Sequence, residues 1–285
     1  MENIPKYAVR NDIIFKYLFS NKGILKDFLE SLLNISISKL DVKEQFNPKA
    51  KNFFEKICYL DIYATINDSK TLNLEMQNEK QSEYIQRIII YRSAMSRQEV
   101  EKGEMYDTLN SIISINILNY IMFENIKEYH TIWSLRENNN LNHKPLNSDE
   151  IHFVELPKFR EANPDFEKKY NQWLAYIDET NPVWVKDVMK KNKVIKSAEI
   201  LKNDFISDKE NQMLIDAYEI YCMDQNTNMK HAKEEGIAEG ISKGEKIALQ
   251  NVVINMLKQN IDIDIISKAT NLSIEEITKI KNSMK

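Results

Sequence analysis

Apolar side chains recur along this chain with two different periods, and each period predicts one kind of secondary structure. Over residues 12–34 they return every three or four positions, which is typical of an amphipathic helix. Over residues 57–66 and 71–76 apolar and polar side chains alternate, which is typical of strands with one buried face. The four residues between these strands, 67–70, are rich in turn formers. The pattern therefore predicts a helix followed by a β-hairpin.

The same patterns extend over the rest of the chain. Strands are predicted at residues 37–46, 111–118, 128–136 and 150–156, and helices at residues 84–100, 170–177, 183–202 and 211–221. Strand signals become rare after Pro157, so we expect a core at residues 1–160, a helical region at 161–227 and a helical tail at 228–285. The fold class is α/β, with a sheet flanked by helices and followed by a helical C-terminal region.

Composition adds limits on location and on partners. The 285 residues contain no apolar run near the ~18 residues of a membrane span. The N-terminus also lacks the apolar stretch of a secretion signal. With only two cysteines, Cys58 and Cys222, we expect a cytoplasmic protein with no membrane partner. The net charge of −4 argues mildly against tight non-specific DNA binding and is neutral about catalysis.

The hairpin gathers polar side chains on one of its faces. Apolar residues occupy even positions in both strands, whereas Asp61, Glu75 and Gln77 occupy odd positions. Apolar positions face apolar positions only if the residue numbers of each cross-strand pair have an even sum. The turn must then contain an odd number of residues, such as 67–69 or 68–70. Asp61 would then lie opposite Glu75 or Gln77.

Two carboxylates this close favour a bound cation. Their mutual repulsion is relieved by Mg²⁺ or Mn²⁺, which prefer oxygen ligands and also bind phosphate oxygens. Such an ion activates water and stabilises charge on a phosphate, while Gln77 could orient either group. The competing interpretation is a solvent-exposed hairpin face, which fits most isolated patterns of this kind.

A resemblance along most of the chain favours the metal site. The matching segments are NDIIFKYLF at residues 11–19, LDI at 60–62, LEMQ at 74–77, GEMY at 103–106, SINIL at 114–118, ELPKF at 155–159 and EEGIAEG at 234–240. Together with Arg87 through Tyr91, these segments resemble the Rpn-type recombination-promoting nucleases. This family belongs to the PD-(D/E)XK nuclease superfamily, and its members are often labelled transposases. That resemblance implies a restriction-endonuclease-like mixed sheet.

The resemblance also implies an activity and its residues. Asp61 and Glu75 would bind the metal, and Gln77 stands where the superfamily usually has lysine. The implied function is Mg²⁺-dependent (or Mn²⁺-dependent) DNA endonuclease activity in recombination or mobile-element biology. A nuclease fold used only to bind DNA or protein is the alternative, since a neutral amide cannot supply the lysine's charge. Strand transfer is a third interpretation, but no separate triad of acidic residues supports it.

Two further residues have two interpretations each. Asp12 is either an additional metal ligand or an acid that stabilises the start of its helix. Arg87 shares a helix face with Tyr84 and Tyr91, so Arg87 and Tyr91 would contact substrate phosphate. Alternatively, Arg87 pairs with a carboxylate such as Glu83.

The tail and the remaining motifs indicate little chemistry. Gly236, Gly240 and Gly244 follow four-residue steps, which suits either close helix contact or a flexible connection. Two short helices divided at Asn271, with a capping box from Ser273 to Glu276, have too few basic residues to predict groove reading. Homo-oligomerisation through these helices, or docking onto the core, is expected instead. The four histidines have no metal-ligand spacing, and nucleotide-binding and nucleophile motifs are absent.

Overall fold

A mixed β-sheet forms the centre of the protein. The computed structural model describes residues 5–43, 62–98, 110–140, 142–145 and 149–283. The strands within these ranges are β1 (Leu40–Val42), β2 (Ile62–Ile66), β3 (Lys70–Gln77), β4 (Ser111–Leu118), β5 (His130–Trp133) and β6 (Glu150–Glu155). Their order is β1-β2-β3-β4-β6-β5, with β3, β4 and β6 parallel and the other pairs antiparallel. The predicted mixed sheet is therefore confirmed.

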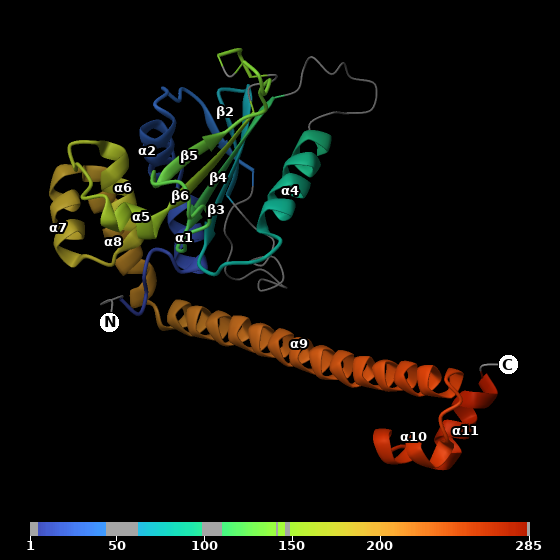
Figure 1. Cartoon of the computed structure of the whole chain (residues 1–285). Helices are drawn as coiled ribbons and strands as arrows, with labels where there is room; N and C mark the ends of the chain where they lie inside the picture. Colours follow the sequence, from blue (N-terminus) through green and yellow to red (C-terminus); the bar gives the residue numbers. More distant parts are fainter. Residues whose placement is uncertain (1–4, 44–61, 99–109, 141, 146–148, 284–285) are drawn as a thin grey trace. The chain divides into compact units, whose positions relative to one another are not determined.

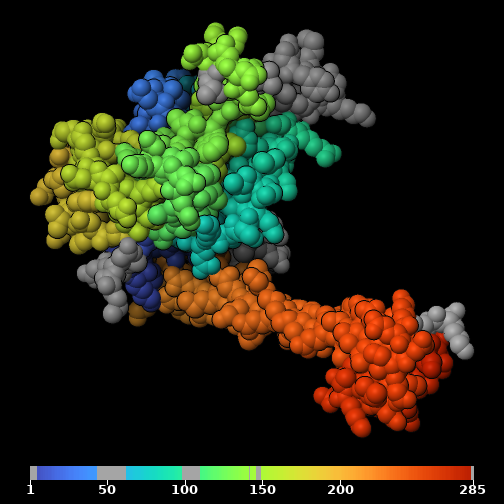
Figure 2. All heavy atoms as spheres, in the orientation of Figure 1, coloured from blue at the N-terminus to red at the C-terminus, as the bar shows by residue number. Residues whose placement is uncertain are grey.

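Helices cover both faces of this sheet. They are α1 (Asp12–Phe19), α2 (Lys22–Leu33), α4 (Tyr84–Gln98), α5 (Leu156–Glu161), α6 (Lys169–Asp178), α7 (Pro182–Lys191) and α8 (Lys193–Ser207). Helix α4 lies on one side of the sheet, whereas α1, α2 and α6–α8 gather on the other (Figure 1). In the space-filling view the atoms of α4 pack directly beside the segment that contains β4 to β6 (Figure 2).

Two of the predicted helices are each broken in two by an asparagine. Residues 12–34 form α1 and α2, because Asn21 has an extended backbone and its side chain accepts hydrogen bonds from Gly23 N and Ile24 N. Residues 183–202 are likewise divided between α7 and α8, where Asn192 caps Val194 N and Ile195 N. The predictions of single helices were wrong here, since apolar periodicity continues across a break when both helices bury the same face.

The β2–β3 hairpin has the odd loop that the sequence predicts. Ile66 pairs with Lys70, so the loop consists of three residues, and Ile62 pairs with Leu74. Asn67 and Asp68 both take left-handed backbone conformations, with φ of 51° and 53°. Asparagine and aspartate tolerate that region better than most residues, which explains a tight turn without glycine.

The chain divides into two compact units, Met1–Ile215 and Asp216–Lys285, and the division falls within α9 (Lys209–Lys258). The three-part division at residues 160 and 227 stays a prediction. Helix α9 extends well past the predicted helix at residues 211–221 and continues through the three glycines. Among the described residues, no helix has both the length and the apolar character needed to cross a bilayer.

The second unit has a small core of its own. Val253 of α9 packs with Ile266 of α10 (Ile263–Thr270) and Ile277 of α11 (Ile274–Ser283), and all three are fully buried. The predicted capping box is confirmed, because the Glu276 carboxylate accepts from Ser273 N at 2.9 Å and Glu276 N donates to Ser273 Oγ at 3.3 Å.

Candidate active site

The polar face of β3 is buried rather than exposed to solvent. Glu75 is 3% exposed and Asn73 is 7% exposed, because α4 packs over this side of the sheet. The interpretation of this face as a solvent-exposed surface was therefore wrong. A buried carboxylate is costly unless it is paired and hydrogen-bonded, so its surroundings indicate what it is used for.

Three side chains satisfy the Glu75 carboxylate. Its Oε1 accepts a hydrogen bond from Asn73 Nδ2 at 3.2 Å, and its Oε2 lies 2.9 Å from the Tyr84 hydroxyl. The guanidinium of Arg87 forms an ion pair with it, with Nη2 3.6 Å from Oε2. Asn73 of the same strand and two residues of the first turn of α4 thus fix the carboxylate in one orientation.

Tyr84 connects Glu75 to the neighbouring parallel strand. Its hydroxyl lies 2.9 Å from Glu75 Oε2 and 2.9 Å from Asn116 Oδ1. The amide of Asn116 is oriented by its Nδ2, which donates to the carbonyl oxygen of His152 at 3.1 Å. Since a tyrosine hydroxyl has one proton, it donates to only one of the two oxygens at a time.

Tyr84 was predicted only as a neighbour of Arg87, and Asn116 was missed. After Ser111 at its start, the strand β4 has two polar residues, Ser114 and Asn116, which pair in register with Asn73 and Glu75. Polar residues at alternate positions of a buried strand were the signal for this contact.

Arg87 lies at the centre of the predicted site. Its Nη2 donates to Gln77 Oε1 and its Nη1 donates to Gln81 Oε1, each at 2.8 Å. Its guanidinium carbon lies 4.9 Å from the ring centroid of Tyr84 and 6.0 Å from that of Tyr91. The predicted helix face is confirmed.

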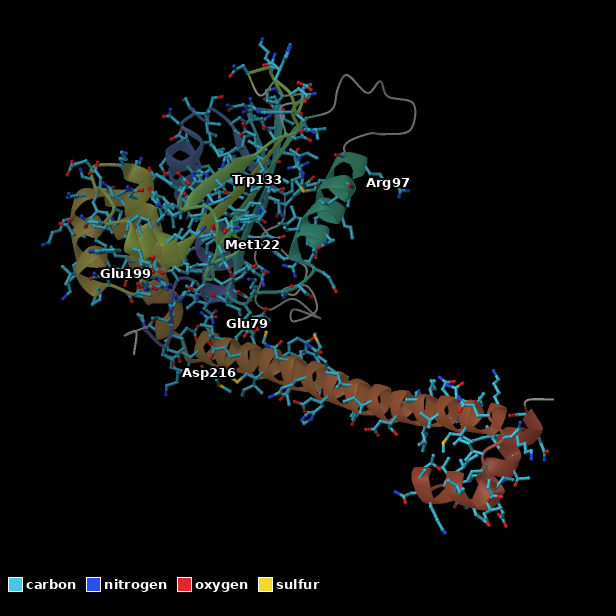
Figure 3. The ribbon with its side chains drawn as sticks, in the orientation of Figure 1. Glu79, Arg97, Met122, Trp133, Glu199 and Asp216 are labelled. Atoms are coloured by element: carbon cyan, nitrogen blue, oxygen red, sulfur yellow. The ribbon has the colours of Figure 1, made fainter. Side chains whose placement is uncertain are left out.

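Four of the predicted site residues are therefore brought together: Glu75, Gln77, Arg87 and Tyr91. The carboxylate that pairs with Arg87 is Glu75, not Glu83. The amide of Gln77 also donates from Nε2 to the carbonyl oxygen of Glu79 at 3.1 Å, in the segment that leads from β3 to α4 (Figure 3). The oxygen of the Gln77 amide thus positions Arg87, and its nitrogen holds the backbone of the segment that follows β3.

Asp12 lies beside the end of β3 but at a helix start. It is the first residue of α1, which Asn11 caps, and its Oδ1 lies 3.4 Å from Asn78 Nδ2. The same Asn78 amide donates to the carbonyl oxygen of Arg10 at 2.8 Å. The position favours stabilisation of the helix dipole, and it also brings a carboxylate to the strand end next to Gln77.

Asp61 lies outside the described residues. The described part of β2 begins at Ile62, which pairs with Leu74. Within the described part of the chain, no three His, Cys, Asp or Glu side chains form a metal-binding group. Glu75 nonetheless offers the hard oxygen ligands that Mg²⁺ and Mn²⁺ prefer, and the guanidinium beside it shows that this position favours a cation.

A second polar cluster anchors the segment that follows β4. The side-chain oxygen of Asn119 accepts from Arg10 Nη1 at 3.0 Å and from Arg160 Nη2 at 2.7 Å. Arg160 also donates to Asp178 from two of its nitrogens, at 2.9 and 2.7 Å. The sequence patterns gave no signal for this cluster, because its residues come from four distant segments.

Comparison with known proteins gives one match. A family model described as PD-(D/E)XK nuclease family transposase matches residues 9–232. No curated protein and no solved structure matches the chain. The matched range covers all six described strands and the residues around Glu75.

Proposed function

Because the chain belongs to the PD-(D/E)XK nuclease transposase family, we propose that it is a metal-dependent DNA endonuclease linked to recombination or mobile elements. The family supports a nuclease-type function. The observation that carries the proposal is the buried Glu75 carboxylate, which shares one site with Gln77 and Arg87. A buried acid with a specific charged partner is a candidate for a functional site.

Asp61 and Glu75, with Asp12 as a further ligand, are the residues that we propose hold Mg²⁺ or Mn²⁺. A bound ion of this kind lowers the pKa of water and neutralises charge that develops on a phosphate. Asn73 and Tyr84 keep the Glu75 oxygens oriented for this role, since each hydrogen-bonds one of them. Fixed orientation matters because ligands held in place need no rearrangement during the reaction.

We propose that Arg87 contacts the phosphate to be cleaved and that Tyr91 supports it. The guanidinium matches phosphate oxygens in geometry and keeps its charge at any physiological pH. Gln77 Oε1 accepts a hydrogen bond from its Nη2 at 2.8 Å. The neutral glutamine, at the position where the superfamily usually has lysine, thus holds the positively charged guanidinium of Arg87, a residue of α4, at the site. This arrangement is consistent with catalysis despite the missing lysine.

A binding module without catalysis is the second candidate. The observation that favours it is the ion pair of Arg87 with Glu75, in which the carboxylate already has a positively charged partner. If no divalent ion displaces this partner, the fold would bind DNA or protein through Arg87 and not cut.

Plasmid cleavage by the full chain tests the two candidates. We expect the wild type to nick or cut DNA with Mg²⁺ or Mn²⁺, and EDTA to stop the reaction. Asp61→Ala and Glu75→Gln should each abolish cleavage, because each removes one negative charge from the proposed metal site. Glu75→Gln keeps the shape of the buried side chain, so the fold should survive.

Glu83→Ala is the matched control, since Glu83 is an exposed carboxylate just before α4. It should cleave like the wild type. Cleavage that persists in both Asp61→Ala and Glu75→Gln would contradict the site. DNA binding without cleavage, under every divalent ion and in every variant, would support the binding module instead.

A further inference from the structure

Two buried hydrogen-bond donors near Glu75 have no hydrogen-bond partner among the described residues. They are Nε of Arg87 and the hydroxyl of Tyr120. Almost all buried donors in folded proteins have a partner, because an unsatisfied one costs roughly 1–3 kcal/mol. Arg87 and Tyr120 both interact electrostatically with Glu75, and each has a donor that no described residue accepts.

Tyr120 follows the end of β4, at the edge of the sheet where Gln77 ends β3. The parallel ladder continues one step past β4, since Asn119 N donates to the carbonyl oxygen of Gln77 at 2.9 Å. The ring of Tyr120 packs against the cluster of Tyr84, Ile88, Leu118 and Phe153. The strand end and this cluster therefore place Tyr120 beside the helix that carries Arg87.

The electrostatics of the hydroxyl link it to the proposed site. Burial raises the pKa of Tyr120 to about 12, the positive charge of Arg87 opposes the increase, and Glu75 and Glu155 add to it. The group therefore stays protonated at neutral pH and can donate a hydrogen bond. The side chain of Arg87 is about one-third exposed and Tyr120 is partly exposed, although Arg87 Nε and the Tyr120 hydroxyl are themselves buried.

We propose that the Tyr120 hydroxyl and Arg87 Nε donate hydrogen bonds to one phosphate group of the nucleic acid. This inference rests on the proposed function, because a phosphate that shares a cation with Glu75 comes close to both donors. Phosphate oxygens accept strong hydrogen bonds from arginine and from hydroxyl groups. Tyr120 is thus a substrate-binding residue that the family resemblance did not include.

Tyr120→Phe tests this inference, because it removes the hydroxyl and keeps the ring in its apolar cluster. The matched control is Tyr170→Phe, since the hydroxyl of Tyr170 is also buried without a hydrogen-bond partner among the described residues. Its ring lies 5.3 Å from that of His130 on the edge strand β5, away from Arg87. Both variants lose one oxygen and keep one partly buried ring.

Two measurements are made on the full chain. The first is the Kd for a DNA duplex by fluorescence anisotropy, with Ca²⁺ to limit cleavage. The second is the increase in melting temperature that inorganic phosphate produces. We expect Tyr120→Phe to bind the duplex about tenfold more weakly, which is typical of one hydrogen bond to a charged group. It should also lose most of the phosphate effect, while Tyr170→Phe should match the wild type in both.

Equal values for Tyr120→Phe and Tyr170→Phe in both measurements would overturn the inference, and would mean that the hydroxyl binds water at most. The phosphate effect is compared with the melting temperature of each variant without phosphate, which separates binding from stability. A phosphate effect that depends on Tyr120, in a wild type that cuts no DNA with any divalent ion, would support the inference and contradict the endonuclease. The two proposals therefore fail independently.

Discussion

Glu75 is a buried acid whose charge is balanced by its immediate neighbours. Asn73 and Tyr84 hydrogen-bond its two oxygens, and Arg87 supplies the positive charge. Removing one partner of such a group costs more folding free energy than the pair itself contributes, because the remaining partner is left buried and unsatisfied. The network therefore fixes the orientation of the carboxylate and adds little net stability.

A pair of histidines on the strands β5 and β6 has a different role. His130 Nε2 lies 3.0 Å from His152 Nδ1, and His152 Nε2 lies 3.2 Å from a carboxylate oxygen of Glu150. Because the carboxylate accepts, His152 donates from Nε2 and accepts at Nδ1 from His130. This chain of hydrogen bonds requires the His152 ring to be neutral, because its Nδ1 accepts.

Acid should therefore destabilise the fold through His130. Burial, helped by repulsion from His152, lowers the pKa of His130 to about 4, whereas an unfolded histidine titrates near 6.5. Between these values only the unfolded chain binds the proton, so stability falls as the pH falls. We expect His130 to account for a loss on the order of 3 kcal/mol in the free energy of unfolding between about pH 7 and about pH 4.

Urea denaturation over this pH range measures the effect. His130→Gln should flatten the pH dependence of the free energy of unfolding. His143→Gln, at an exposed position in the loop after β5, should keep the wild-type slope. An unchanged slope in His130→Gln would show that other groups cause the acid sensitivity.

At the level of single residues, the sequence predicts the site better than its surroundings. Glu75, Gln77, Arg87 and Tyr91 could be predicted because alternation and helical spacing place each on a known face. The contacts of Tyr84 and Asn116 could not, since they depend on how α4 packs across two parallel strands. The buried donors of Tyr120 and Arg87 Nε likewise depend on how distant segments pack, which no sequence pattern shows.

Among the elements, the turn between β2 and β3 sets the register of the proposed site. Asn67 holds this turn against the segment before β1, because its Oδ1 accepts from Ser38 N at 2.9 Å and from Lys39 N at 3.1 Å. Its Nδ2 donates to the carbonyl oxygen of Ser36 at 3.1 Å. One side chain thus ties the hairpin to the chain that precedes it.

Two substitutions at Asn67 separate the contributions of side chain and backbone. Asn67→Gly keeps the left-handed conformation and loses the hydrogen bonds, so we expect a loss of about 1–2 kcal/mol in the free energy of unfolding. Asn67→Ala loses the same bonds and adds a conformational cost of about 1 kcal/mol. Denaturation by urea measures both values.

Asp68→Gly is the control for these variants. Its φ of 53° also favours glycine, and the side chain forms only an exposed ion pair with Lys39 among the contacts of the described residues. We expect it to leave stability unchanged or slightly higher. Equal stability of Asn67→Gly and the wild type would show that the side chain does not hold the turn.

Element types could be predicted more reliably than their ends. The strand at residues 111–118 was predicted to the residue, and the hairpin was predicted with an odd loop, of which the structure has the 67–69 alternative. The breaks at Asn21 and Asn192 were missed. An asparagine between regularly spaced apolar residues fits both an exposed position within one helix and the cap of a second helix. The short helix α5 was missed because its six residues are too few to show a period.

On the scale of the whole molecule, helix α9 is the feature that the sequence predicted least well. It has 50 residues and no continuous apolar face, so periodicity gave no evidence for its length. Three glycines also predicted a break or a close contact at residues 236–244, since each costs roughly 1 kcal/mol in a helix. The structure shows them within the helix and exposed.

Replacing these glycines with alanine should therefore strengthen the helix. A Cβ at Gly236, Gly240 or Gly244 would meet no atom within 4 Å, so nothing in the folded chain opposes the change. Each Gly→Ala substitution should add up to ~1 kcal/mol of helix stability, seen as a stronger helical circular-dichroism signal and a higher melting temperature. Ala238→Gly, at an exposed position between them, should have the opposite effect.

The same variants decide how the chain uses this stretch of glycines. Homo-oligomerisation through close helix contact requires small residues, because added methyl groups would force two helix backbones apart. Analytical ultracentrifugation of the triple Gly→Ala variant should then show less self-association even as helicity rises. A rise in helicity with no change in assembly would leave the glycines as points of local flexibility, and a fall in helicity would contradict the continuous helix itself.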